Sequence, residues 1–350
     1  MAEVDFKAPV TARQHAWMGA WWRRVGTLRD APSQMEGMVL SIACIACVLF
    51  IWWVITLGEG DSRLVDVYTL PSPADTFASL PLLWERGLSI SALTSLSRVF
   101  GGFLIAAAIG VPLGLISGSY MRVGAFFKPV SIFGRNVPIA ALIPLTLIWF
   151  GLGEVQKVMF IFLAAVAFVH FDSSSAARAV PDRFLETAYT LGARQNWTKG
   201  LRLCLIVAAV YALVAALGWS LLQEDVRVAD DVKSAGFWLR AVLGLVLGCG
   251  LWFPLLSHQA LRKVVVPMAM PDVVNSLRLL FGLAFGYIML AEVINAKRGL
   301  GALIITSQRQ GPREHIYLCL AIIALLAWGI DRFILMIQRQ AFPYLKHGQD

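Results

Sequence analysis

Charged residues are scarce in this 350-residue sequence. Asp, Glu, Lys and Arg make up 15% of it and apolar residues 58%, whereas soluble chains carry roughly 25% charge. Two stretches, 37–58 and 203–223, contain no charged residue, and each exceeds the ~18 residues that suffice to cross a bilayer. The shortage of charge excludes an ordinary soluble domain and predicts an all-α integral membrane protein.

Cysteine is scarce too, and its placement argues against thiol chemistry. All five cysteines lie in apolar stretches, and the C-x-x-C formed by Cys44 and Cys47 has no second Cys or His pair beside it. A metal or redox site of this kind needs further ligands at matched spacing. We therefore expect helix packing at these positions, with no metal or redox site.

The net charge of +8 does not indicate nucleic acid, because the basic residues are dispersed among apolar spans. Basic loops beside membrane segments explain the charge, and Lys and Arg concentrate on the cytoplasmic side of a membrane. With the N-terminus inside, the inner segments carry 17 Lys and Arg against 9 in the outer segments. We predict a multi-pass protein in the lipid bilayer with both termini cytoplasmic.

The hydrophobic pattern divides the chain into six parts. We expect a cytoplasmic amphipathic segment, a first transmembrane helix with its periplasmic connection, a first core part, an inserted transmembrane hairpin, a second core part and a cytoplasmic tail, at 1–36, 37–89, 90–199, 200–261, 262–340 and 341–350. The predicted spans cover about 37–58, 90–117, 126–151, 158–171, 203–223, 236–257, 273–294 and 316–330.

Two of these spans contain residues that predict their packing. Pro138 and Pro144 fall inside the third span, where proline frees carbonyls and kinks a helix. The second span contains glycines at spacings that allow another helix to approach closely, namely Gly101, Gly102, Gly110 and Gly114. The fourth span is expected to close on Asp172, so that its neighbour His170 lies at a capped helix end. A proton-linked His170 and Asp172 pair is the alternative.

A polar stretch at 186–193, Glu-Thr-Ala-Tyr-Thr-Leu-Gly-Ala, lies between apolar spans and is expected to open as a helix after Pro181. It resembles the EAA loop of the inner-membrane permeases of ATP-binding-cassette (ABC) importers, although Thr187 replaces an alanine. The resemblance implies a coupling helix that docks on a cytoplasmic ATPase. Glu186 would act at the ATPase contact, and small residues would allow close docking, namely Ala188, Gly192 and Ala193. The alternative is that Glu186 only caps and solubilises a loop.

The loop is interrupted in this chain. In the family an apolar-apolar-Pro ending follows the glycine after about a dozen residues, whereas here Pro267 lies 75 residues after Gly192. The extra residues, near 200–261, hold two apolar runs around an acidic linker. They predict a transmembrane hairpin, because two crossings preserve the orientation of the downstream spans. A single re-entrant hairpin is the alternative.

Further motifs follow in the order typical of the nitrate, sulfonate and taurine branch: 70–73, 97–103, 143–145, 149–154, 277–279, 291–293, 299–301 and 331–332. The resemblance implies a type I ABC importer permease-like bundle of six core transmembrane helices plus two inserted, about eight in total. It also implies a homodimer of permeases in the bacterial inner membrane, a cytoplasmic ABC ATPase that uses the ATP, and a periplasmic or lipid-anchored solute-binding protein. A permease of this kind would have no catalytic residue and no cofactor of its own.

Polar residues within membrane spans are costly, so they are candidates for the translocation pathway. These are Arg135, Asn136, Arg278 and Glu292. The alternatives are interhelical hydrogen bonds or snorkelling to the interface for the first three, and helix packing or a gate for Glu292.

Three functions are compatible with the sequence. The first is an import permease for a small anion such as nitrate, a sulfonate or taurine. The second is a permease-like scaffold or regulatory subunit whose coupling loop is altered by the insert. The third is an ion-driven secondary transporter, which would be expected to show embedded acids and paired broken helices.

Overall fold

The structure, a computed structural model, describes residues 32–58, 63–66, 69–222, 244, 248–310 and 312–343. It divides into two compact units, Met1–Pro73 and Ala74–Asp350. The elements are helices: α2 (Gln34–Ile55), α3 (Pro73–Ala78), α4 (Leu80–Glu85), α5 (Leu88–Ser119), α6 (Met121–Asn136), η2 (Ile139–Ala141), α7 (Leu142–Phe150), α8 (Glu154–Ala179), α9 (Asp182–Thr190), α10 (Trp197–Leu222), η3 (Leu261–Val265), α12 (Val266–Asn295), α13 (Leu300–Gln310) and α14 (Glu314–Ala341). The helical class predicted from composition is confirmed.

The first unit contains α2, which covers most of the first predicted span. A capping box begins the helix, because the Glu36 amide donates to the Ser33 hydroxyl at 3.3 Å and the Ser33 amide donates to the Glu36 carboxylate at 3.0 Å. At the other end, the Thr56 hydroxyl donates to the carbonyl of Trp52. These local bonds satisfy groups that a helix end would otherwise leave unpaired.

The second unit has its core between α5, α8 and α12. Four glycines of α5 lie so close to α8 that an added Cβ would meet its atoms at 2.5–2.8 Å, namely Gly102, Gly110, Gly114 and Gly118. The close approach predicted from glycine spacing is therefore confirmed for this helix pair. Gly101, also included in that prediction, has ordinary contact distances of 3.7 Å and more.

Packing against α5 also explains why α8 is longer than predicted. The expectation that the span closes on Asp172 is wrong, because the helix continues to Ala179. Ser173 and Ser174 are buried there against the α5 glycines. His170 therefore lies within the helix, where its ring nitrogens contact the hydroxyls of Ser117 at 3.0 Å and Ser131 at 3.2 Å. The polar side chains of this stretch join α5, α6 and α8 instead of ending the span.

The third predicted span is broken, as its prolines indicate. The segments Met121–Asn136 and Ile139–Phe150 meet at an angle of 90°. Pro138 has extended backbone dihedrals and precedes the turn η2. Pro144 lies in the first turn of α7, where its missing N–H would have no helical partner in any case.

Within the described residues, five helices are long and apolar enough to cross a membrane, or up to six if the bent pair counts as one span. Of the two inserted runs, the first is the helix α10. Half of the second, 236–257, lies outside the described residues, and its described end is the short helix Gly248–Ser257. The count of eight spans therefore stays a prediction.

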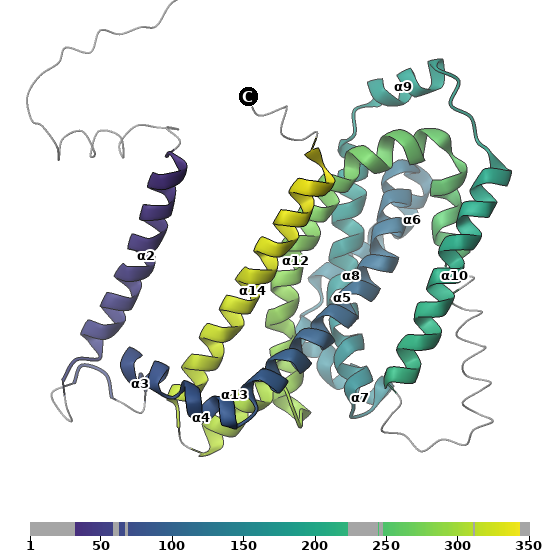
Figure 1. Cartoon of the computed structure of the whole chain (residues 1–350). Coiled ribbons are helices and arrows are strands. Elements are labelled where there is room, and N and C mark those ends of the chain that lie inside the picture. The colour runs from purple at the N-terminus through teal and green to yellow at the C-terminus, as the bar shows by residue number, and fades with distance from the viewer. Residues whose placement is uncertain are drawn as a thin grey trace, which may run out of the picture. The chain divides into compact units, whose positions relative to one another are not determined.

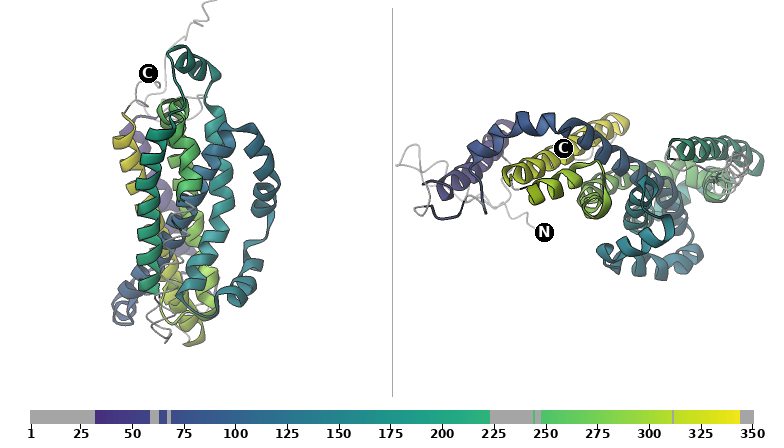
Figure 2. Two further views of the ribbon diagram at one scale, coloured as in Figure 1. Left: turned by 90° about the vertical axis from the view of Figure 1, so that its right-hand side faces the viewer. Right: turned by 90° about the horizontal axis from the view of Figure 1, so that it is seen from below.

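The second unit has two distinct ends. Figure 1 shows α9 projecting at one end and α4, α7 and α13 gathered at the opposite end. In the left view of Figure 2, α9 again lies beyond the end of the bundle, and α10 runs along its side. The two candidate sites described next lie at these two ends.

Candidate functional site

The helix α9 is the predicted coupling element. Pro181 precedes it with extended backbone, and Asp182 stands in its first turn, where a negative charge is favourable. Leu185 is half-buried and packs against the core, whereas Glu186 is exposed to solvent. The helix is therefore amphipathic, with one face against the bundle and the other exposed among the described residues.

A Schellman motif ends α9. The Gly192 amide donates to the Tyr189 carbonyl at 2.9 Å, and the Ala193 amide donates to the Ala188 carbonyl at 2.9 Å. Gly192 has φ of 82°, which L side chains rarely adopt, and an added Cβ would find nothing within 4 Å. Glycine is thus required here by backbone conformation and not by a neighbour within the chain.

Tyr189 connects α9 to two other parts of the molecule. Its ring meets the His258 ring edge-on, with centroids 6.1 Å apart. Burial, together with the nearby Tyr189 phenol, raises the pKa of Tyr120 at the junction of α5 and α6. The predicted docking helix is therefore in contact both with the core and with the segment that leads into α12.

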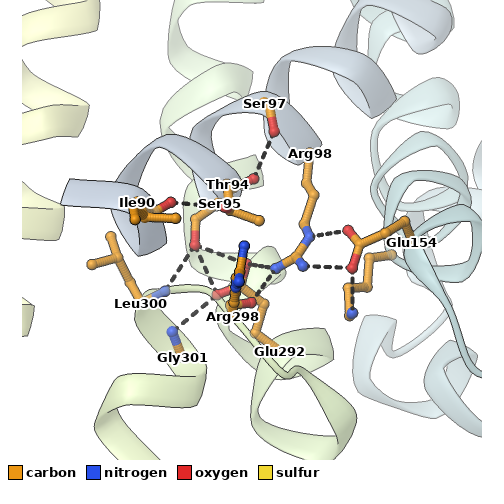
Figure 3. A network of polar contacts seen from close by, with 11 residues as sticks. Ile90, Thr94, Ser95, Ser97, Arg98, Glu154, Glu292, Arg298, Leu300 and Gly301 are labelled. Atoms are coloured by element: carbon orange, nitrogen blue, oxygen red, sulfur yellow. Dashed lines mark hydrogen bonds and ion pairs between the residues drawn. The ribbon is translucent and has the colours of Figure 1, made fainter. Parts of the chain in front are cut away.

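The opposite end of the unit holds a network of buried charges centred on Arg98 of α5 (Figure 3). Its guanidinium donates through Nη2 to the Glu154 carboxylate at 2.6 Å and through Nη1 to Glu292 at 2.6 Å. Nη1 also donates to the Arg298 carbonyl at 2.7 Å. The Lys157 ammonium donates to Glu154 at 3.1 Å, so two cations balance two carboxylates. Glu154 is 40% exposed and Arg98 only 3%, so the network faces solvent on the Glu154 side.

Glu292 is the most enclosed member of this network, because its side chain is fully buried. The Ser95 hydroxyl donates to it at 2.7 Å, and the Gly301 amide donates at 2.9 Å. An added Cβ at Gly299 would lie 2.5 Å from the carboxylate, and one at Gly301 would lie 2.7 Å from the Glu292 Cβ. The two glycines therefore leave the space that the carboxylate occupies.

Four motifs that are far apart in the sequence meet in this network: 97–103, 149–154, 291–293 and 299–301. Glu292 was among the pathway residues predicted from the sequence, whereas Arg98 and Glu154 were assigned to no site. The available signal was charge: Arg98 and Glu292 lie near the ends of apolar spans, and a buried charge needs a partner of opposite sign. What the network does is to tie α5, α8, α12 and the start of α13 together at one end of the bundle.

The remaining predicted pathway residues do not join Glu292. Arg278 forms an ion pair with Asp331 of α14, with Nε and Oδ1 3.1 Å apart. The Arg135 guanidinium lies 3.8 Å from the centre of the Phe171 ring. Asn136 donates to the Ile132 carbonyl of its own helix at 2.9 Å. Arg135 and Asn136 are both exposed at the break between α6 and α7. A pathway role for these four residues stays a prediction.

No metal centre is formed by the part of the chain that the structure describes, since it brings no three His, Cys, Asp or Glu residues into a cluster that would hold an ion.

Relatives of the chain come from bacteria and an archaeon. The taurine transport system permease protein of Escherichia coli K12 is 24% identical over 318 residues, covering 89% of this chain and 91% of its own length. The bicarbonate transport system permease protein of Synechococcus elongatus is 24% identical over 337 residues, covering 94% and 98%. A putative ABC transporter permease protein of Methanocaldococcus jannaschii is 25% identical over 266 residues, covering 76% of each.

The fold has a counterpart among solved structures. A chain of the MetNI methionine ABC transporter, in an inward-facing conformation, superposes with a TM-score of 0.50 at 16% sequence identity, covering 74% of this chain and 97% of that chain. At this identity the likeness concerns the fold alone.

The family profile described as binding-protein-dependent transport system inner membrane component matches residues 110–225 and 255–343, more than half of the chain. The match is interrupted inside the inserted segment. Members of this family are non-catalytic transmembrane subunits that use no cofactor themselves and work with an ATPase and a solute-binding protein. The chain belongs to this family of multi-pass inner membrane components and is an ABC importer permease subunit.

Proposed function

We propose that this permease imports a small anion and that a separate ATPase, docking at α9, drives its alternating access. The observation that carries the proposal is α9 itself, an exposed amphipathic helix with a Schellman stop that rests on the core. A helix held in this way can pass a displacement to the bundle, because two packed states of the core can be biased by contacts at one end.

The nature of the solute rests on a second line of support. The relatives include permeases for taurine, for bicarbonate and, putatively, for aliphatic sulfonates. In this chain, Arg135 and Asn136 are exposed at the break between α6 and α7. A second copy of the chain facing this break would enclose a pathway with cationic and hydrogen-bond-donating groups, which suits nitrate, bicarbonate or a sulfonate.

The coupling step is tested by co-purification. The permease is co-expressed in turn with each ATP-binding subunit encoded in the source genome, solubilised in detergent and isolated through its own tag. We expect one ATPase to be retained by the wild type and lost by Glu186→Ala and by Gly192→Val, a β-branched residue that the left-handed backbone at this position disfavours. Retention of the ATPase by both variants would show that α9 does not form the contact with the ATPase.

The solute is tested by uptake. Cells that lack the permease and cells that carry it are given labelled taurine, nitrate or bicarbonate. We expect the permease to restore uptake of one of the three, Arg135→Gln to reduce it, and Arg135→Lys to preserve most of it. Uptake that is indifferent to the charge at position 135 would contradict a pathway role for Arg135.

The second candidate function is a permease-like scaffold or regulatory subunit. The separation of 75 residues between Gly192 and Pro267 favours it, because the coupling loop is split. In that case no ATPase is retained by the wild type. The third possibility raised by the sequence, an ion-driven secondary transporter, is set aside because the family match spans most of the core.

A further inference from the structure

The split coupling loop is rejoined in space. Gln195 and His258 form an isolated antiparallel bridge. The Asn196 amide donates to the Ser257 carbonyl at 2.8 Å, and the Gln259 amide donates to the Arg194 carbonyl at 3.4 Å. The two points at which the chain leaves and rejoins the core are therefore held together by backbone hydrogen bonds, although about 60 residues separate them. We call the paired segments 194–196 and 257–259 the base bridge.

The segment enclosed by the base bridge packs on itself. Asn196 caps α10, since its side chain accepts from the Lys199 amide at 3.0 Å. An added Cβ at Gly200 would lie 2.6 Å from Ser257, and one at Gly248 would lie 2.7 Å from Ala208. Small residues thus bring α10 and the returning helix into close contact at these two positions, as in other membrane helix pairs.

The described part of the same segment also contacts the core, and one of these contacts is polar. The Tyr211 hydroxyl of α10 donates to the Ala108 carbonyl of α5, and the Trp252 indole N–H donates to the Tyr211 hydroxyl at 3.1 Å. Within the described residues, the segment is thus attached to the bundle at its base, through Tyr211 on its side and through Leu255, which belongs to the buried core cluster.

Past the base bridge, the chain turns at once into the element next to α9. The π-helical turn η3 contacts α9 and leads directly into α12. The turn contains Arg262, which is half-buried, and Lys263, which is exposed. Tyr189 of α9 meets His258 of the base bridge. The end of the molecule that carries Glu186 therefore also carries two basic side chains, Arg262 and Lys263, which follow the insert in the sequence.

We propose that the base bridge joins α9 and η3 into one continuous ATPase-docking surface. The coupling path then does not run through the hairpin 197–256, and this hairpin is dispensable for docking. The inference rests on the proposed function of α9. The partner is an ATPase subunit whose docking groove presents carboxylates to Arg262 and Lys263 beside the contact with Glu186.

The geometry of the base bridge prescribes a deletion. The bond from the Asn196 amide to the Ser257 carbonyl is of the kind that closes a two-residue β-hairpin. Residues 197–256 are replaced by Asn-Gly, the residues that favour such a turn. We expect the shortened permease to retain the same ATPase as the wild type within about twofold. Loss of the ATPase from a shortened protein that remains monodisperse and melts cooperatively would overturn the proposal.

A full-length pair of variants decides the question if the shortened chain does not fold. We expect Arg262→Glu combined with Lys263→Glu to weaken ATPase retention about tenfold, through charge mismatch at the contact. Arg202→Glu, which reverses an exposed charge in the first turns of α10, should leave retention unchanged. An unchanged double variant, or an equal loss with Arg202→Glu, refutes the composite surface. If the wild type itself retains no ATPase, the proposed function of α9 has failed instead.

Discussion

Arg98 and Glu292 are 194 positions apart in the chain, yet their side chains meet at 2.6 Å with almost no exposure to solvent. The pair lies at the end of the bundle opposite α9 and belongs to a network that joins four helices. A buried ion pair often contributes little net stability. We therefore infer that the main role of the network is to fix the relative positions of the helices that it joins. It holds the ends of these helices in one arrangement.

This view predicts different outcomes for single and double replacements in the network. Arg98→Ala or Glu292→Ala leaves a buried charge without its partner, and each should destabilise the permease by about 3–5 kcal/mol. The double variant Arg98→Met, Glu292→Met removes both charges at similar volume and should recover most of that loss. Thermal unfolding in detergent measures the stability, and uptake by cells measures the function.

If the network serves transport as well as folding, the double variant should be stable but should import poorly. A double variant that is as unstable as the singles would contradict the charge argument. One that is stable and fully active would show that the network serves stability alone.

The close contact between α5 and α8 predicts that one methyl group added at this contact will destabilise the protein. An added Cβ at Gly114 would lie 2.5 Å from Ser173 and 2.6 Å from the His170 carbonyl, and that backbone atom cannot move without shifting α8. Gly114→Ala should therefore lower stability by about 1–3 kcal/mol. Gly286→Ala is the matched control on α12, since its Cβ meets nothing within 4 Å. We expect the control to be neutral or slightly stabilising, as measured by the unfolding temperature.

The Schellman stop predicts which residues can replace Gly192. Asn adopts left-handed backbone conformations far more readily than a β-branched residue does. Gly192→Asn should therefore preserve ATPase retention, whereas Gly192→Val should strain the turn by about 1–3 kcal/mol and reduce retention. Both are read by co-purification with the ATPase. Equal loss in the two variants would mean that Gly192 is needed for close contact with the partner and not for its backbone conformation.

The hairpin prediction is tested by labelling at Ala229, a position that falls outside the described residues. In a chain without native cysteines, a single cysteine at 229 should react with a membrane-impermeant maleimide on intact, outer-membrane-permeabilised cells. The expectation follows from two crossings of the bilayer, with the acidic linker outside. Reaction only after the inner membrane is disrupted would contradict the arrangement with two crossings and favour a re-entrant hairpin.

The side attachment of the hairpin predicts a small loss of stability on removal of one oxygen atom. Tyr211→Phe deletes the bond to Ala108 and leaves the Trp252 indole without its acceptor. Hydrogen bonds between membrane helices contribute roughly 1 kcal/mol, so the unfolding temperature should fall slightly. Tyr287→Phe on α12, whose hydroxyl makes no hydrogen bond within the described residues, should leave it unchanged. A larger effect at Tyr287 would contradict this account of the attachment.

The sequence by itself determined the helical membrane class, most spans, the break in the third span and the polar helix near Glu186 with the long segment that follows it. These features depend on local pattern: apolar runs long enough to cross a bilayer, prolines within a helix, and a short motif around Glu186 and Gly192. Hydrophobicity and backbone conformation act between neighbours in the chain, so they can be read in order.

The tertiary structure decided what depends on partners far apart in the sequence. Packing on the α5 glycines carried α8 past Asp172, although the polar stretch there suggested an end. Arg98 acquired its role only when α8, α12 and α13 brought Glu154 and Glu292 to it. The base bridge likewise closed the insert by backbone hydrogen bonds, which carry no side-chain pattern. Pairing of this kind follows from which helix faces pack together, and no local pattern in the sequence fixes that.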